Sequence, residues 1–302
     1  MGERIVRIAG VDICADTAGD PADPAILLIG GASAALDWWP DEFCDRLAAG
    51  GRYVIRYDHR DTGRSATYPP GRPGYHAADL ESDAAGLITE LAGGRAHVVG
   101  VSMGGGLAQS LGVRRPSMVA SLTLIATSPI SRRVSTEPLP SVAPRVADAF
   151  AHPQPDPDWT DRDSVIAYLL AQEELYAAGG FDPELTREIA GRVFDRSVSI
   201  ASAANHGLVV GEDDGDDGPA DLAALAVPTL VIHGAEDPMF PPAHGRALAA
   251  EIPGAVLLTL ERMGHQVPPR STWDVVVPAI LRHTGAHIDR NGQETAEPGL
   301  SA

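Results

Sequence analysis

The sequence predicts an α/β fold: a doubly wound, mostly parallel sheet with helices on both faces and an inserted helical lid. Three observations support this prediction. Short apolar runs alternate with helical stretches through most of the chain. One such run, 96–101, passes directly into a serine flanked by glycines and then into a helix. The alternation stops after residue 129, which places a core at 1–129 and 219–288 and a lid at 130–218.

The composition narrows the class of protein and its partners. The 302 residues include 44% hydrophobic and 21% charged residues, which is ordinary for a folded globular chain. A formal net charge of -18 argues against nucleic acid or an anionic membrane as a partner. Only two cysteines occur, Cys14 and Cys44, which argues against a disulfide framework or a zinc site. Neither a signal peptide nor a membrane-spanning segment is apparent, so we expect a cytoplasmic protein. We also expect no metal or cofactor.

The first strands are expected at 4–14 and 25–30, with a turn-rich link at 17–24. The second strand is apolar on both faces, as an inner strand of a parallel sheet should be. It ends at Gly30-Gly31, where backbone N–H groups can face an open cleft. In an acyl-transfer enzyme this loop supplies one oxyanion donor, here the amide of Ala32. An ordinary glycine turn is the alternative.

A helix at 41–49 and a strand at 53–57 come next, followed by a dense polar turn at 58–65. His59 and Asp61 in this turn would suit a catalytic pair. We favour the structural interpretation, in which the charges hold a tight loop together through ion pairs and hydrogen bonds.

The centre of the chain carries the strongest motif. After a helix at 79–91, the strand 96–101 meets Gly100-Val101-Ser102-Met103-Gly104, an instance of Gly-x-Ser-x-Gly. A sharp strand-to-helix turn strains the serine and brings nearby backbone so close that the flanking positions must lack side chains. The turn also directs a helix amino end at the hydroxyl, where negative charge is stabilised. The alternative is a serine that merely caps the helix.

A helix at 104–111 and a strand at 122–126 follow, and then the pattern changes. The stretch 130–160 is rich in proline and polar residues. Helices are expected at 164–178 and 183–192, opened by Asp163 and Asp182. An acidic, glycine-punctuated run at 211–219 is typical of a solvated loop, with calcium binding as a weaker alternative. A lid of this kind suits an enzyme that covers an apolar substrate and excludes water.

The core resumes beyond residue 219 with more strands and helices. The expected elements are strands at 227–233 and 256–260, helices at 243–252 and 273–283, and a disordered tail at 289–302. Pro278 is expected to kink the second of these helices. Each strand ends in a short polar segment, which in doubly wound sheets lies on the ligand-binding edge.

Three residues that follow predicted strands form a candidate catalytic triad: Ser102, Asp237 and His265. The serine hydroxyl is a weak nucleophile, so a histidine must take its proton and an acid must orient that histidine. The order serine, acid, histidine fits this arrangement. Competing positions remain open, namely Glu236 for the acid and His59, His206, His233 and His244 for the base. His233, at the end of a buried strand, is favoured as a core residue.

These motifs resemble the α/β-hydrolase superfamily over essentially the whole chain. The segments that carry the resemblance are Gly30-Gly31, 56–65, the serine motif, 234–238 and Met263-Gly264-His265. Segments 39–43, 56–65 and 96–100 are also similar to the methylesterases that act on anthracyclines. The resemblance implies Ser102 as nucleophile, Asp237 as acid and His265 as base. It further implies Ala32 and Met103 as backbone donors to the oxyanion, although Gly30-Gly31 stands where the superfamily usually has His-Gly.

The expected function is a serine carboxylesterase that hydrolyses a bulky apolar ester through an acyl-enzyme. A methyl ester of an aromatic polyketide is the substrate that the resemblance suggests. Lactonase, C–C bond hydrolase and cofactor-free haloperoxidase activities on the same triad are alternatives, as is a ligand-binding protein without turnover. Candidates for substrate contacts, each of which could equally be a core residue, are Gly31, Trp38, Met103, Met239 and Phe240.

Overall fold

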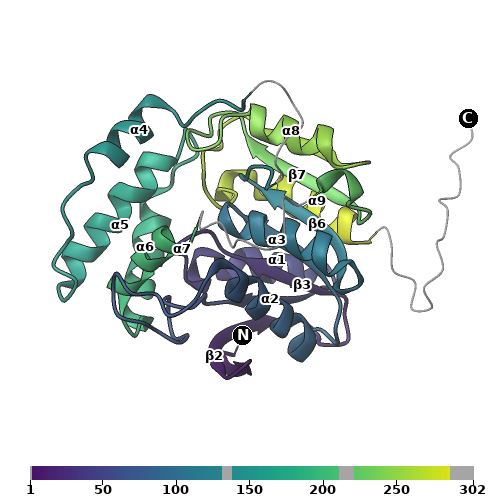
Figure 1. Ribbon diagram of the computed structural model, residues 1–302, viewed down its shortest axis with the longest axis horizontal. Coiled ribbons are helices and arrows are strands. Elements are labelled where there is room, and N and C mark those ends of the chain that lie inside the picture. Colours follow the sequence, from purple (N-terminus) through teal and green to yellow (C-terminus); the bar gives the residue numbers. More distant parts are fainter. Residues whose placement is uncertain (1, 131–137, 211–220, 286–302) are drawn as a thin grey trace, which may run out of the picture.

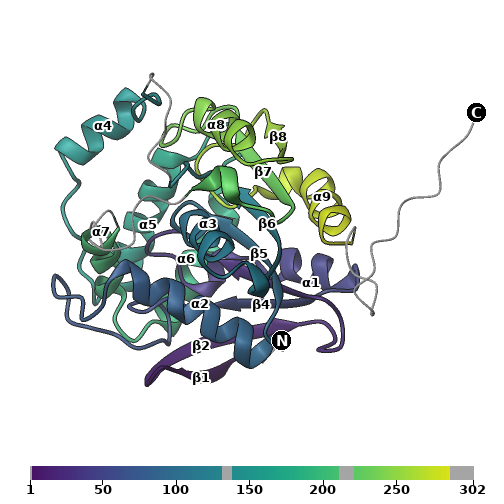
Figure 2. The ribbon, with the colours of Figure 1, turned by 45° about the vertical axis from the view of Figure 1, so that its right-hand side comes forward.

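The computed structural model describes residues 2–130, 138–210 and 221–285. The expected acidic loop at 211–219 and tail at 289–302 lie outside the described residues. Eight strands form one sheet in the order β1-β2-β4-β3-β5-β6-β7-β8 (Figures 1 and 2). The strands are β1 (Arg4–Ile8), β2 (Val11–Ala18), β3 (Ala25–Ile29), β4 (Tyr53–Tyr57), β5 (Ala96–Val101), β6 (Val119–Ile125), β7 (Thr229–Gly234) and β8 (Val256–Leu260).

The amino-terminal part of the sheet differs from the prediction. A single strand at 4–14 was wrong, because β1 and β2 form an antiparallel hairpin in which Ile8 pairs with Val11. Ala9 and Gly10 make the turn with φ angles of 46° and 86°. Two successive residues with positive φ match the right-handed twist of a tight hairpin. The pair β2–β4 is also antiparallel, and every later pair in the sheet is parallel.

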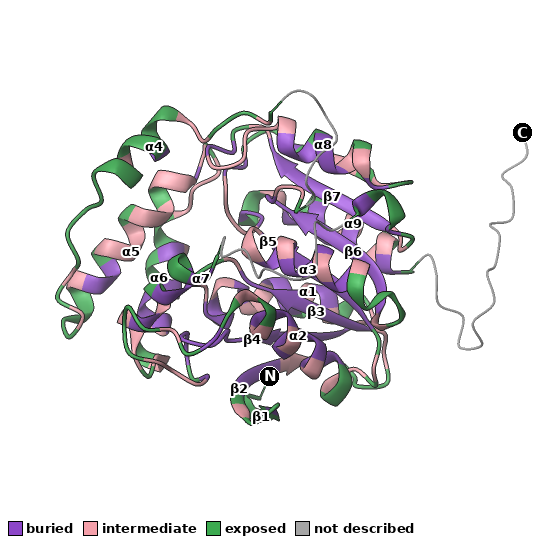
Figure 3. Cartoon of the chain, viewed as in Figure 1, coloured by how far each residue is buried: buried purple, intermediate pink, exposed green. Residues whose placement is uncertain are grey.

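Helices cover both faces of the sheet, as predicted. The core helices are α1 (Asp41–Ala49), α2 (Ala77–Leu91), α3 (Met103–Arg114), α8 (Ala243–Glu251) and α9 (Trp273–Gly285). One buried apolar cluster joins α2, α3 and α8 to the sheet, and a second joins α1 and α9 to the opposite face. All five residues of β3 are buried because apolar layers enclose them on both sides. Burial in Figure 3 is accordingly concentrated in the strands.

Between β6 and β7 the chain leaves the sheet. The helices of this insertion are α4 (Pro144–Ala151), α5 (Arg162–Tyr176), α6 (Pro183–Arg196) and α7 (His206–Val209). Asp161 rather than Asp163 caps α5, whereas Asp182 caps α6 as expected. Helix α4 lies within the proline-rich stretch and was missed, and Figure 3 shows it mostly exposed. Figure 1 shows α4, α5 and α6 grouped to one side of the sheet.

Two further observations concern the expected absences. Within the three described ranges, no helix combines the length and the apolar character that crossing a membrane requires. The same residues contain no cluster of three or more ligand-type side chains suited to a metal ion. Cys14 and Cys44 are both free and buried.

Candidate active site

The turn between β5 and α3 has the strained geometry that the motif predicts. Ser102 has φ 54° and ψ −118°, a positive φ that is costly for a residue with a side chain. A Cβ on Gly100 would lie 2.1 Å from the carbonyl oxygen of Gly104. A Cβ on Gly104 would lie 2.5 Å from the carbonyl oxygen of Gly30. Both glycines are therefore required by close backbone approaches, and Ser102 stands at the amino end of α3.

The structure brings the three predicted triad residues into one hydrogen-bonded chain. His265 Nε2 lies 2.8 Å from Ser102 Oγ, and His265 Nδ1 lies 3.1 Å from Asp237 Oδ2. The three residues follow β5, β7 and β8, whose carboxyl ends share one edge of the sheet. Because an ionised carboxylate only accepts hydrogen bonds, Asp237 fixes the proton on Nδ1 and leaves Nε2 free to accept from Ser102.

Backbone amides hold the carboxylate of Asp237 in place. Its Oδ1 accepts hydrogen bonds from the N–H groups of Met239 (2.9 Å) and Phe240 (2.8 Å). The side chain of Asp237 is fully buried, whereas that of His265 is 10% exposed. The ring of Phe240 lies edge-on to His265, with centroids 5.2 Å apart. The backbone N–H of His265 donates to the carbonyl of Tyr176, the last residue of α5. The insertion therefore helps to position the imidazole.

The loop after β3 lies beside the serine. A Cβ on Gly31 would be 3.5 Å from that of Ser102, and both residues line the same cavity. Among the described residues, no hydrogen-bond acceptor is found for the N–H of Ala32 or for that of Met103. Two unpartnered amides near a nucleophile are what an oxyanion hole requires.

Two buried histidines hold this loop. Ser33 has φ 63°, and its N–H donates to His206 Nδ1 at 2.7 Å. The other nitrogen, His206 Nε2, donates to the carbonyl of Arg60 at 2.9 Å. His59 Nε2 lies 3.1 Å from the carbonyl oxygen of Gly30, to which it donates. Burial lowers the pKa of His59 to about 3 and also lowers the pKa of His206, so both imidazoles are neutral at pH 7. Sequence reasoning missed this role of His206, because a lone histidine in an insertion carries no motif.

The remaining competitors for the triad form other hydrogen bonds. His233 Nε2 donates to the carbonyl of Phe240 and lies 3.7 Å from Asp237 Oδ2, beyond hydrogen-bonding distance. Burial lowers the pKa of His233. His244 contacts Ser128 and the carbonyl of Pro140. Glu236 accepts from the N–H of Gly179 at 3.3 Å.

The polar turn at 58–65 is structural, as favoured. Asp61 accepts hydrogen bonds from the N–H of Tyr68, the hydroxyl of Tyr75 and the side chain of Asn205. Asp58 binds the N–H groups of Leu36 and Arg64. Both carboxylates are therefore engaged in hydrogen bonds to the loop itself and to neighbouring segments.

A cavity of about 420 Å³ opens onto Ser102 and His265. Its size is within the range of small-molecule sites. Gly31, Ala32, Trp38 and Met239 line it, whereas Phe240 and Met103 are not among its lining residues. Much of the opposite wall comes from α5 and α6, whose side chains the sequence analysis did not single out. Ser102, Asp237 and His265 could be recognised from sequence motifs, whereas the wall residues of α5 and α6 belong to no motif.

A Ser-His-Asp arrangement at the carboxyl edge of a mostly parallel sheet is typical of α/β-hydrolases, and comparison with known proteins gives the same class. The family model for the alpha/beta hydrolase fold matches residues 24–267. A solved structure of a hydrolase from Pseudomonas aeruginosa PA01 is 26% identical, with a TM-score of 0.66 over 94% of this chain and 98% of that one. The chain belongs to the α/β-hydrolase family and is an enzyme of the hydrolase class.

More similar relatives narrow the group. Rhodomycin D methylesterase DauP from Streptomyces sp. (strain C5) is 33% identical over 305 residues, covering 95% of this chain and 99% of the relative. Rhodomycin D methylesterase DnrP from Streptomyces peucetius is 31% identical over 299 residues, with the same coverage of 95% and 99%. Within its family the chain therefore belongs with the carboxylic ester hydrolases that include these methylesterases.

Proposed function

We propose that the protein is a serine methylesterase that hydrolyses the methyl ester of a bulky, largely apolar aromatic polyketide. The observation that carries the proposal is the 2.8 Å approach of His265 Nε2 to Ser102 Oγ, with Asp237 bound to the other ring nitrogen. The largely apolar cavity beside Ser102 and His265 supports the substrate class, as do the relatives named as rhodomycin D methylesterases.

The first half-reaction forms an acyl-enzyme. Ser102 Oγ attacks the ester carbonyl carbon while His265 Nε2 takes the hydroxyl proton. Asp237 stabilises the resulting imidazolium through its bond to Nδ1. The carbonyl oxygen gains negative charge beside the N–H groups of Ala32 and Met103, at the amino end of α3. His265 then protonates the leaving methoxide, and methanol departs.

The second half-reaction regenerates the enzyme. Water gives a proton to His265 and attacks the Ser102 ester, and collapse of the intermediate returns the proton to Ser102 Oγ. The products are the free carboxylic acid and methanol. We propose that the helices of the 130–218 insertion act as a lid, since they supply much of the cavity wall and limit the access of water.

The test uses a chromogenic ester and a polyketide ester in parallel. With p-nitrophenyl acetate, a burst of p-nitrophenol stoichiometric with enzyme is expected, and Ser102→Ala should abolish both the burst and turnover. Ser117→Ala, at an exposed serine beyond the far end of α3, is the control and should keep both. Mass spectrometry of an aromatic polyketide methyl ester should show loss of 14 Da, about one CH₂, on conversion to the acid. Turnover retained in Ser102→Ala would overturn the proposal.

A further inference from the structure

One carboxylate in the cavity has no role in the proposed chemistry. Glu173 lies on α5, one helical turn before Tyr176, and its side chain is partly buried in the cavity wall. A single face of α5 lines the cavity, as the helical spacing of its members requires. These residues are Tyr168, Leu169, Gln172, Glu173 and Tyr176.

The other charged groups of the cavity are already paired. Asp182 accepts the N–H of Leu185, Asp61 accepts three hydrogen bonds, and Arg270 binds Glu42. Among the described residues, by contrast, the carboxylate of Glu173 has no hydrogen-bonding or ion-pair partner. Burial raises its pKa to about 7. An unpaired carboxylate at a partly buried position is unfavourable unless something else supplies the donor.

Aromatic side chains surround the same part of the cavity. Trp159, Tyr168, Tyr176 and Phe181 all line it. The rings of Trp159 and Tyr168 lie edge-on, with centroids 5.5 Å apart. Glu173 lies three residues before Tyr176 on α5, and Tyr168 lies on the same face of that helix and lines the same cavity. Burial raises the pKa of Tyr176, and the charge of Glu173 and then Tyr168 raise it further. Ring faces and a carboxylate attract a cation together, through its charge and its N–H donors.

We propose that Glu173, with Tyr168 and Tyr176, forms a subsite for a cationic amine substituent carried by the ester substrate. An ammonium group would donate to the Glu173 carboxylate and lie against the aromatic rings. The inference rests on the proposed function, because it assumes that the ester reacts at Ser102 in this cavity.

The position of the subsite also defines where the amine must be. The ring of Tyr176 lies 6.2 Å from that of His265. Glu173 lies three residues earlier on α5, about 5 Å farther along the helix axis. The amine must therefore be several bonds away from the reacting carbonyl, so the subsite selects substrates without taking part in the chemistry.

The experiment compares two methyl esters of one aromatic acid, which differ only in a primary amine or its N-acetyl derivative on a short side chain. The wild-type enzyme should favour the amine ester by at least about tenfold in kcat/KM, equivalent to roughly 1.4 kcal/mol. Glu173→Gln should bring this ratio close to one. Glu174→Gln is the matched control, because Glu174 is the exposed neighbour on the same helix, and it should keep the wild-type ratio.

A binding measurement separates this inference from the proposed function. Calorimetry with the carboxamides that correspond to the two esters needs no turnover, and tighter binding of the amine compound to wild type than to Glu173→Gln is expected. Equal binding of the two carboxamides by wild type, or a preference that survives in Glu173→Gln, would overturn the subsite. Turnover of both esters that depends on Ser102, at equal rates, would leave the esterase proposal standing and refute the subsite alone.

Discussion

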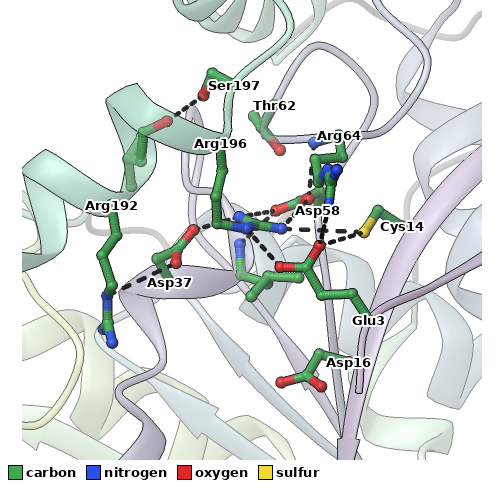
Figure 4. A network of polar contacts seen from close by, with 12 residues as sticks. Glu3, Cys14, Asp16, Asp37, Asp58, Thr62, Arg64, Arg192, Arg196 and Ser197 are labelled. Carbon is green, nitrogen blue, oxygen red and sulfur yellow. Dashed lines mark hydrogen bonds and ion pairs between the residues drawn. The ribbon is translucent and has the colours of Figure 1, made fainter. Parts of the chain in front are cut away.

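Two buried aspartates at the carboxyl edge of the sheet are each held by two backbone N–H groups, but they have different roles. Asp237 follows β7 and binds two backbone N–H groups and the imidazole of His265. Asp58 follows β4 and also binds two backbone N–H groups, those of Leu36 and Arg64. Its third partner is Arg196 at the end of α6, 2.9 Å away, so this cluster ties the insertion to the core (Figure 4).

The two clusters differ in the chemistry of the side chain that the aspartate binds. Arg196 also binds Glu3 at 2.7 Å and Asp37, and it lies 4.0 Å from the Cys14 sulfur (Figure 4). All of its ion pairs are with carboxylates, and a guanidinium keeps its charge. His265 can gain and lose a proton, and its second nitrogen faces Ser102 beside an open cavity. A buried aspartate thus locks two segments together when its partner is an arginine, and it supports proton transfer when its partner is an imidazole.

The largest effect is expected where proton transfer depends on the aspartate. Asp237→Asn should lower kcat by about 10³- to 10⁴-fold with little change in fold, because an amide can donate to Nδ1 and favour the wrong tautomer. Steady-state kinetics with p-nitrophenyl acetate, together with circular dichroism, measures this. Glu236→Gln is the control and should stay within about threefold of wild type. A greater loss in Glu236→Gln would transfer the acid role to Glu236.

A large effect of another kind is expected at the Asp58 cluster. Arg196→Met should lower the free energy of unfolding by about 3 to 5 kcal/mol, because Asp58 would be left buried without its cation and Asp37 would keep only Arg192, 3.9 Å away. Urea unfolding measures this. Arg162→Met removes an exposed ion pair with Asp195 on the same insertion and should leave the urea midpoint unchanged. Should Arg196→Met keep wild-type stability but lose kcat, the cluster would be part of the catalytic machinery.

A smaller effect is expected at His206, which contacts the active-site loop without joining the proton relay. His206→Phe should lower kcat by about 10- to 100-fold at nearly constant KM, because Ser33 loses its acceptor and the Ala32 amide loses its position. Kinetics at a temperature well below unfolding measures this. His152→Phe, at an exposed histidine of the insertion, should match wild type. A rise in KM alone would show that the loop binds substrate and does not support the oxyanion.

The smallest effect concerns Glu173, whose carboxylate binds neither a backbone amide nor a cation among the described residues. Its pKa is raised to about 7 from 4.5, so the folded state holds a proton that the unfolded state has lost. Stability from this group is present below pH 4.5 and falls as the pH rises towards 7.

Glu173→Gln should therefore raise Tm relative to wild type at pH 8 and have little effect at pH 4. Thermal unfolding at both pH values measures this, with Glu174→Gln as the control that changes neither. An equal gain at both pH values would mean that the change acts through packing and not through charge.

The parts of the fold that were predicted depend on local sequence. The strand and glycine-flanked turn around Ser102 follow from residues within a few positions of one another, and so does the inner strand 25–29. The hairpin at Ala9–Gly10 was missed because Ala9 adopts a positive φ that its residue type does not signal. Helix α4 was missed because its turns lie in a proline-rich stretch.

The sequence by itself determined the fold class, the strained serine turn and the order serine, acid, histidine, because each follows from residue type and short spacing. The tertiary structure decided which of the 10 histidines meets Ser102, which histidine holds the loop after β3, and which carboxylate enters the cavity unpaired. The physical reason is that these contacts join residues up to 173 positions apart in the sequence. They arise only when parallel strands align their carboxyl ends and the insertion packs over that edge.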